Sequence, residues 1–183
     1  ESLKGISRME SLQMILDAGN HADDFSQADK EVLAEKKNHF YQQLIATLTE
    51  EDILPGMKSF IRSAKVAGYK MSIASASKNA PMILEHLGLA NDFVGIVDPA
   101  TLTKGKPDPE IFVRAAEVLE LAPNQVIGLE DSVAGIESIN SAGQISLAIG
   151  DAVVLSAANL IFSSTVDVTL QSIQSKMDKI KSN

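Results

Sequence analysis

Three short polar segments have residue types that suit a site for phosphate and a divalent cation. The segments are Ser75-Ala76-Ser77-Lys78-Asn79, Gly105-Lys106-Pro107-Asp108-Pro109 and Glu130-Asp131-Ser132. The first supplies hydroxyl and amide donors, the second an ammonium group, and the third a pair of carboxylates. Hydroxyl, amide and ammonium groups bind phosphate oxygens, and carboxylates bind hard cations such as Mg2+. Together they predict phosphate chemistry that uses a metal ion.

The segment from Ser75 to Asn79 precedes a predicted helix in which Pro81 suits the first turn. Backbone N–H groups at the start of a helix, together with hydroxyl groups, form a binding site for anions. Lys78 adds a positive charge that favours phosphate. Ser and Asn also cap helices without any ligand, so this segment alone leaves both interpretations open.

Lys106 lies in a loop that Pro107 and Pro109 make rigid. A rigid loop limits how far the ammonium group moves, and an ammonium group held in place can neutralise a phosphoryl group. The alternative is an exposed loop lysine, which is the commoner role of a single Lys.

Glu130 and Asp131 end an almost wholly apolar run. Two adjacent carboxylates at such a place repel each other unless a cation or hydrogen-bond donors lie near. Mg2+ takes oxygen ligands, so it fits this pair. In the alternative interpretation, Asp131 and Ser132 cap a helix that runs from Ala134 onward. The position at the end of a strand favours the metal.

Apolar runs that alternate with helical patterns predict α/β architecture from residue 54 onward. The predicted strands are residues 70–74, 93–97, 126–129, 146–149 and 160–162, and the predicted helices are 57–67, 81–87, 109–119, 134–142 and 170–180. Because the runs are mostly apolar and do not alternate between apolar and polar residues, they predict a parallel sheet buried on both faces. Ligands bind at the carboxyl ends of such strands. All three polar segments follow strands, so we expect them to converge on one pocket.

Residues 11–49 are predicted to be helical, with no strand among them. Leu12, Ile15 and Leu16 recur at helical spacing, and Gly19-Asn20 can end that helix. At Leu54-Pro55-Gly56 the chain turns. We therefore expect a small helical domain over residues 1–53 and an α/β domain over residues 54–183.

The composition excludes several classes of protein. With 183 residues, 45% of them hydrophobic, the chain is long enough for one sizeable core. A net charge of -8 and a pI near 4.8 argue against a nucleic-acid partner. There is no Cys, no apolar run near the roughly 20 residues that a membrane helix requires, and no signal peptide, so we expect a cytoplasmic protein without a membrane partner.

In this order and context, the segments resemble the haloacid dehalogenase superfamily of phosphotransferases. The resemblance extends from Leu3 to the last helix, and its most specific passages are Leu3-Lys4-Gly5-Ile6-Ser7-Arg8, Ile73 to Asn79 and Ile127 to Ser132. It implies a Rossmann-like core with a parallel sheet and a small helical cap. It also implies a magnesium-dependent mutase that interconverts β-glucose 1-phosphate and glucose 6-phosphate, through an aspartyl-phosphate and a bisphosphate.

The resemblance implies a role for each candidate residue. Ser75, Ala76 and Lys106 would hold the phosphoryl group that is transferred, and Glu130 and Asp131 would help to hold magnesium. A second phosphate would be bound by Arg8, Ser77, Lys78 and Asn79, and the sugar would be contacted from the cap by Lys37. Closure of the cap would then assemble a site that excludes water.

The sequence departs from the family at the nucleophile. The family uses two Asp residues, spaced Asp-x-Asp, after an N-terminal strand, and this sequence contains no such motif. About 40 further residues would supply that strand, its catalytic turn and a first cap helix. We therefore expect the first core strand to be missing from this chain, its own N-terminal segment to be a possible partner, and the chain alone to be inactive.

Two other functions remain open at this stage. A phosphatase of the same superfamily needs no second phosphate site, so Arg8, Lys78 and Asn79 would matter little to it. A binding domain that has lost its nucleophile would bind a sugar bisphosphate without turnover.

Overall fold

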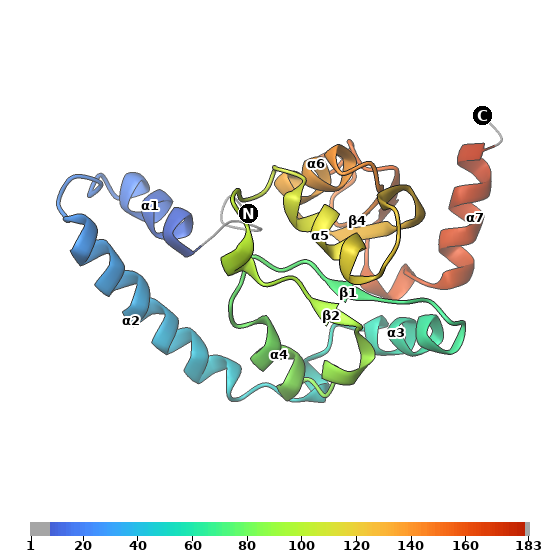
Figure 1. Ribbon diagram of the computed structural model, residues 1–183, viewed down its shortest axis with the longest axis horizontal. Coiled ribbons are helices and arrows are strands. Elements are labelled where there is room, and N and C mark those ends of the chain that lie inside the picture. The colour runs from blue at the N-terminus through green and yellow to red at the C-terminus, as the bar shows by residue number, and fades with distance from the viewer. Residues whose placement is uncertain (1–7, 182–183) are drawn as a thin grey trace.

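The computed structural model describes residues 8–181, in which helices and strands alternate after an all-helical beginning (Figure 1). The helices are α1 (Arg8–Ala18), α2 (Gln27–Ile45), α3 (Met57–Val66), α4 (Ala80–His86), α5 (Glu110–Val118), α6 (Val133–Ser141) and α7 (Leu170–Lys181). The strands are β1 (Ser72–Ile73), β2 (Gly95–Ile96), β3 (Ile127–Glu130), β4 (Ile145–Ile149) and β5 (Leu160–Phe162). The α/β alternation predicted from the sequence is confirmed, although the first two strands are shorter than predicted.

Helices α1 and α2 form a helical hairpin that extends away from the strands (Figure 1). Leu12 and Leu16 of α1 are buried against Ala34 of α2, so a small apolar cluster holds the two helices together. Helix α2 begins with a capping box, in which the Ser26 hydroxyl accepts a hydrogen bond from the Asp29 backbone and Asp29 accepts one from the Ser26 backbone.

The other face of α2 carries large apolar side chains that are exposed. The exposed fractions of Val32, Phe40 and Leu44 are 66%, 57% and 66%. These positions are spaced by multiples of four, so they form one stripe along the helix. The helical hairpin therefore buries one side of α2 and leaves an apolar side uncovered.

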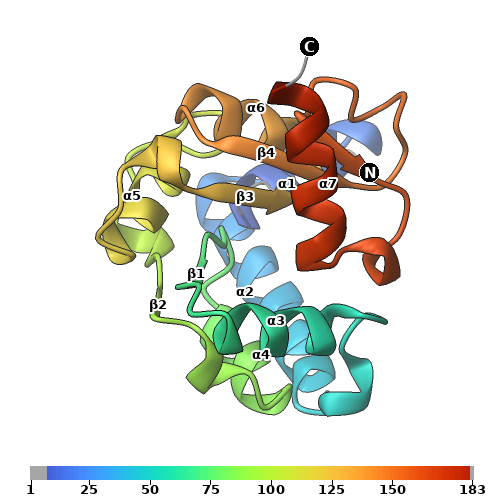
Figure 2. The ribbon, with the colours of Figure 1, turned by 90° about the vertical axis from the view of Figure 1, so that its right-hand side faces the viewer.

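The strands form two separate parallel sheets. Strand β1 pairs only with β2, and β3, β4 and β5 pair in that order, within residues 8–181. The sheets lie one beyond the other, and β1 and β3 are the edges that face each other (Figure 2). In the described part of the chain, no ladder joins these two edges, so one side of each strand has unpaired backbone groups.

Helices cover both sheets and bridge the break between them. Helix α5 contacts β1 and β2, α6 contacts β3 and β4, and the two helices contact each other. On the other side, α7 contacts β5 and also α3. Within residues 8–181, no helix combines the length and the apolar character needed to cross a bilayer.

Candidate active site

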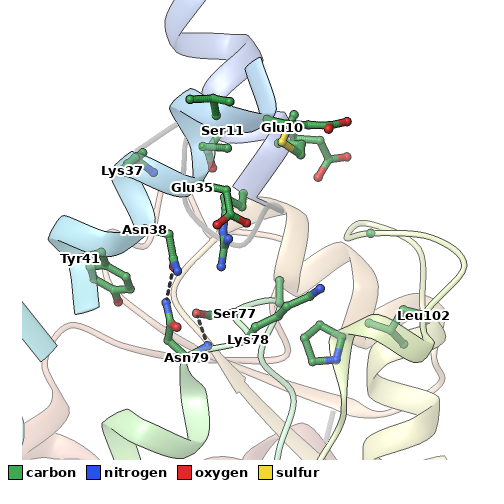
Figure 3. Close-up of a pocket in the computed structure, with 18 of the residues that line it drawn as sticks. Glu10, Ser11, Glu35, Lys37, Asn38, Tyr41, Ser77, Lys78, Asn79 and Leu102 are labelled. Atoms are coloured by element: carbon green, nitrogen blue, oxygen red, sulfur yellow. Dashed lines mark hydrogen bonds between the residues drawn. The ribbon is translucent and has the colours of Figure 1, made fainter. Parts of the chain in front are cut away.

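A cavity of about 1230 Å³ lies between the helical hairpin and the loops that follow β1 and β2. Figure 3 shows side chains from the hairpin facing side chains of the loop after β1. The lining of the cavity includes Arg8, Glu31, Glu35, Lys37, Asn38, Ala76, Ser77, Lys78, Asn79 and Lys104. One wall therefore comes from the region predicted as a cap and the other from the ends of strands.

The loop from Ser75 to Asn79 is held by its own hydroxyl groups. The Ser77 backbone N–H donates to the Ser75 hydroxyl at 3.1 Å, and the Asn79 backbone N–H donates to the Ser77 hydroxyl at 3.2 Å. Such local bonds fix a turn before a helix, which here is α4. Lys78 is exposed in this loop, whereas Asn79 is only 6% exposed.

Basic side chains reach the cavity from both of its walls. Arg8 and Lys37 belong to the helical hairpin, and Lys78 and Lys104 belong to the facing loops. Acidic side chains such as Glu31 and Glu35 line the hairpin side as well. Basic groups on two opposed walls suit an anionic ligand that spans the cavity.

Lys106 and Glu130 form a buried ion pair at the end of β3. The distance from Lys106 Nζ to Glu130 Oε2 is 2.6 Å, and the side chains are only 6% and 9% exposed. The ammonium group also lies 4.9 Å from the centre of the Phe112 ring, a cation–π contact. The other carboxylate oxygen, Glu130 Oε1, accepts hydrogen bonds from the Asp131 and Ser132 backbones and from the Ser132 hydroxyl. Each oxygen of Glu130 is therefore engaged.

Gly135 makes room for this carboxylate. A Cβ atom at Gly135 would lie 2.1 Å from the Glu130 carboxyl group. Gly135 is the third residue of α6, and its N–H donates to the Ser132 hydroxyl that begins the helix. Any larger residue would push Glu130 out of its bonds, so glycine is required here by close approach and not by backbone conformation.

The loop that carries Lys106 is anchored at two points. The Ser138 hydroxyl, fully buried in α6, donates to the Asp108 carbonyl at 2.6 Å. Glu110 of α5 accepts hydrogen bonds from the Thr103 hydroxyl, the Thr103 backbone and the Lys104 backbone. These bonds, chiefly the one from the Thr103 hydroxyl, lower the pKa of Glu110.

The structure places the predicted site residues in two groups. Arg8, Lys37, Ala76, Ser77, Lys78 and Asn79 line the cavity, whereas the other predicted residues that the structure describes, Ser75, Lys106, Glu130 and Asp131, lie outside its lining. Gly105 is in the cavity wall and directly precedes Lys106, so the two groups adjoin. The passage Leu3 to Ser7, which the sequence also singled out, lies outside the described residues.

Sequence reasoning missed several residues that shape this region. Three of them, Asn38, Gln42 and Ser138, act through hydrogen bonds to residues distant in the sequence. The fourth, Gly135, makes room for the nearby Glu130 side chain. One signal was available: Asn38 and Gln42 are spaced by one helical turn and follow Ala34 on the same face of the helix.

Comparisons with known proteins agree with this geometry. Residues 4–143 match the sequence model of the haloacid dehalogenase-like hydrolases. The chain is 42% identical over 181 residues to β-phosphoglucomutase of Bacillus subtilis (strain 168), covering 99% of this chain and 80% of that protein. A crystal structure of β-phosphoglucomutase from Clostridium difficile has a TM-score of 0.94 and 43% identity, covering 100% of this chain and 82% of that one. A "phosphorylated carbohydrates phosphatase" of Thermotoga maritima is 29% identical over 143 residues, or 77% of this chain and 63% of that protein.

Proposed function

This chain belongs to the haloacid dehalogenase-like hydrolase family and is a β-phosphoglucomutase-like phosphosugar enzyme, and on that premise we propose its reaction. It interconverts β-D-glucose 1-phosphate and glucose 6-phosphate through an aspartyl-phosphate and a bisphosphate intermediate. We further propose that residues 1–53 are the cap domain and residues 54–183 the core domain. The enzyme works in the cytoplasm, in keeping with a chain that has no cysteine.

The observation that carries this proposal is the cavity with basic groups on two opposed walls. A mutase must hold a sugar that bears a phosphate at each end during its reaction. Arg8 and Lys37 from the hairpin face Lys78 and Asn79 from the core, and this arrangement suits a ligand with two anionic ends. A phosphatase with one phosphate to bind needs no such pair of walls.

Each predicted residue has a role in the proposal. The phosphoryl group to be transferred is held by Ser75, Ala76 and Lys106, the other phosphate by Arg8, Ser77, Lys78 and Asn79, and the sugar by Lys37 from the cap. Lys106 enters this role already neutralised by Glu130, within a loop fixed by Ser138 and Glu110. Its ammonium group is therefore oriented before any ligand arrives.

Asp131, with Glu130 beside it, would help to hold Mg2+. In this structure Glu130 Oε2 is paired with Lys106 and Oε1 accepts three hydrogen bonds, so Glu130 would bind the ion directly only by exchanging one of these contacts. Carboxylate oxygens are ligands that Mg2+ prefers, and Mg2+ is commonly bound by one or two carboxylates together with water and substrate phosphate. Among residues 8–181, no cluster of three or more Asp, Glu or His side chains is placed to hold a metal, so in this proposal further ligands come from the Asp-x-Asp segment, the substrate phosphate and water. The ion would neutralise charge on the phosphoryl group.

The nucleophile, in this proposal, arrives on a strand between β1 and β3. The facing edges of these strands lack ladder partners in the described part of the chain, and a parallel strand between them would join the two sheets into one. The exposed apolar stripe of α2 suits a further helix from the same segment. The Asp-x-Asp carboxylates of that segment would supply the nucleophile and the general acid and base, and without them the 183 residues are inactive.

The phosphatase named among the relatives supports a second candidate, a sugar-phosphate phosphatase. Arg8→Ala distinguishes the two in a chain extended by the Asp-x-Asp segment. For a mutase, loss of one charged phosphate contact lowers kcat/KM with β-glucose 1-phosphate about 100-fold. Hydrolysis of p-nitrophenyl phosphate, which has a single phosphate, changes little.

Arg62→Ala is the matched control, because Arg62 is an exposed residue of α3 outside the cavity lining. It leaves both reactions unchanged. Equal small effects of Arg8→Ala on both substrates would favour the phosphatase. Binding of glucose 1,6-bisphosphate with no turnover by the extended chain would instead favour a binding domain without catalytic function.

A further inference from the structure

Two side chains of α2 hold the side chain of Asn79 from the opposite wall of the cavity. Asn79 Nδ2 donates to Asn38 Oδ1 at 2.8 Å, and Gln42 Nε2 donates to Asn79 Oδ1 at 3.3 Å. Figure 3 shows Asn38 and Asn79 pointing toward each other across the space between the helical hairpin and the loop after β1. Both ends of the Asn79 amide are therefore bound to the hairpin, and the second N–H of Nδ2 is the donor left for the phosphate proposed above.

Asn38 and Gln42 occupy the inward face of α2. They are four residues apart, so they lie one above the other on the helix. The same face continues to Ala34, which is buried against α1, and to Ile45, which is also buried. Polar residues within an otherwise buried face are retained where they have specific partners, and here the partner is Asn79.

Asn79 is a rigid point to which the hairpin is attached. The backbone N–H of Asn79 donates to the Ser77 hydroxyl, and Asn79 is almost fully buried. Asn79 also directly precedes α4. A helix that docks on this amide takes its position from the loop that lines the cavity. Lys37 adjoins Asn38 in the sequence and lines the same cavity, so its position is set together with that of Asn38.

We propose that Asn38 and Gln42 are positioning residues that dock the helical hairpin on Asn79 and so set the separation of the two walls. This inference rests on the proposed function, because the separation matters for a sugar bisphosphate whose two phosphates are bound by opposite walls. The two residues touch Asn79 and not the reacting atoms. They act by keeping Arg8 and Lys37 at the distance from Lys78 that the ligand requires.

The test measures the position of the hairpin directly. The sequence has no cysteine, so Ala18→Cys on α1 and Glu117→Cys on α5, both exposed, allow two spin labels to be attached specifically. In the 183-residue chain, pulsed EPR is expected to give a narrow distance distribution. Asn38→Leu and Gln42→Met each remove one hydrogen bond at similar size, and each is expected to broaden that distribution.

Affinity for glucose 1,6-bisphosphate, measured by calorimetry, gives a second result. Each substitution is expected to weaken binding about threefold to tenfold, the range for loss of one hydrogen bond between neutral groups. Gln43→Met is the matched control, because it makes the same change one residue further along α2, where the side chain bonds to exposed His39. It leaves both the distance distribution and the affinity unchanged.

A conservative pair separates the hydrogen bonds from general effects on the fold. Asn38→Asp keeps an oxygen that accepts from Asn79, and Gln42→Glu is accommodated when the amides of Asn79 and Asn38 turn over, so both hydrogen bonds persist in each single variant. The double variant leaves the Asn79 oxygen against a carboxylate in either orientation. Each single variant is expected to keep the narrow distribution, and the double variant to broaden it.

Unchanged distance distributions in Asn38→Leu, Gln42→Met and the Asn38→Asp/Gln42→Glu double variant would overturn the inference. The outcome for the proposed function is separate. If glucose 1,6-bisphosphate fails to bind the unsubstituted chain while the distributions still broaden, the docking contact stands and the bisphosphate substrate is wrong.

Discussion

The buried Lys106–Glu130 pair and the cavity between the hairpin and the core are built in opposite ways. The pair lies within the core, with both side chains less than one tenth exposed and each Glu130 oxygen engaged. The cavity is shared between the hairpin and loops after strands, and its lysines 37, 78 and 104 are exposed. Charges in the first region are already satisfied, whereas those in the second are presented to a ligand.

The difference indicates how the two regions divide the work. A group that must act at a reacting phosphoryl group benefits from an orientation fixed by the fold. Groups that recognise the rest of a substrate can lie on two separate parts of the molecule, here the hairpin and the core, whose separation the contacts to Asn79 set. Substitutions in the buried pair should therefore change stability, and substitutions in the cavity should change binding.

Breaking the Lys106–Glu130 pair should lower the free energy of unfolding more than any other substitution considered. Lys106→Met leaves Glu130 as a buried carboxylate without its cation, and the free energy of unfolding is expected to fall by about 3 to 5 kcal/mol. Urea unfolding measures it. Lys104→Met is the control, since Lys104 is 72% exposed in its pair with Asp108 and should cost less than about 1 kcal/mol. Equal costs would mean that the buried pair is not a distinct structural centre.

Gly135→Ala should disturb the Lys106–Glu130 pair without removing either charge. The new Cβ displaces the Glu130 carboxyl group, and the free energy of unfolding is expected to fall by about 2 to 3 kcal/mol. The cost should largely disappear in a Glu130→Ala background, which a double-mutant cycle measures. Ser141→Ala, on the exposed side of the same helix, is the control. If the costs of Gly135→Ala and Glu130→Ala simply add, the close approach of Gly135 to the Glu130 carboxyl group is not the cause.

Lys78→Met should separate binding from stability. Loss of a charged contact is expected to weaken glucose 1,6-bisphosphate binding at least about tenfold, while the free energy of unfolding stays within about 0.5 kcal/mol of the unsubstituted value. Calorimetry and urea unfolding on the same samples measure the two quantities. A large loss of stability would show that the cavity is built like the buried pair.

The smallest expected effect is a local loss of stability at low pH around Glu110. The pKa of Glu110 is lowered in the folded chain, chiefly by the hydrogen bond from the Thr103 hydroxyl, so its bonds to Thr103 and Lys104 stabilise the fold above the ordinary carboxyl pKa of 4.5. This contribution is lost as pH falls through the lowered pKa. NMR hydrogen exchange should show the protection of the Thr103 and Lys104 amides falling over that range. Glu110→Gln should lack this change, and identical profiles would refute the account.

Much of the fold could be predicted from the sequence, since each of the five mostly apolar runs predicted as strands contains a strand of a parallel sheet. The exceptions are the lengths of β1 and β2, predicted as residues 70–74 and 93–97 but only two residues each. Each strand has one paired neighbour at most, and ladder pairing is what extends a strand. The exposure of Phe40 and Leu44 also could not be read from helical spacing, which fixes faces but not what covers them.

The location of part of the candidate site could be predicted from residue types, because Ala76, Ser77, Lys78 and Asn79 of the predicted phosphate loop line the cavity. Glu130 was predicted as a ligand of Mg2+, which stays a prediction; the ion pair that it forms with Lys106 was not predicted. The supporting residues were not predictable, because Ser138 and Gln42 resemble ordinary helix positions. Their roles depend on which loop lies opposite, and that is a property of the tertiary structure.

The most direct test of the central claim is a mutase assay on two forms of the chain. Formation of glucose 6-phosphate from β-glucose 1-phosphate is measured with Mg2+ and glucose 1,6-bisphosphate, for the 183 residues alone and for the chain extended at its N-terminus by the family's Asp-x-Asp segment. We predict no turnover by the former and turnover by the latter, which disappears when the first Asp of the motif is changed to Asn. Turnover by the 183 residues alone, or none by a folded extended chain that binds the bisphosphate, would contradict the account.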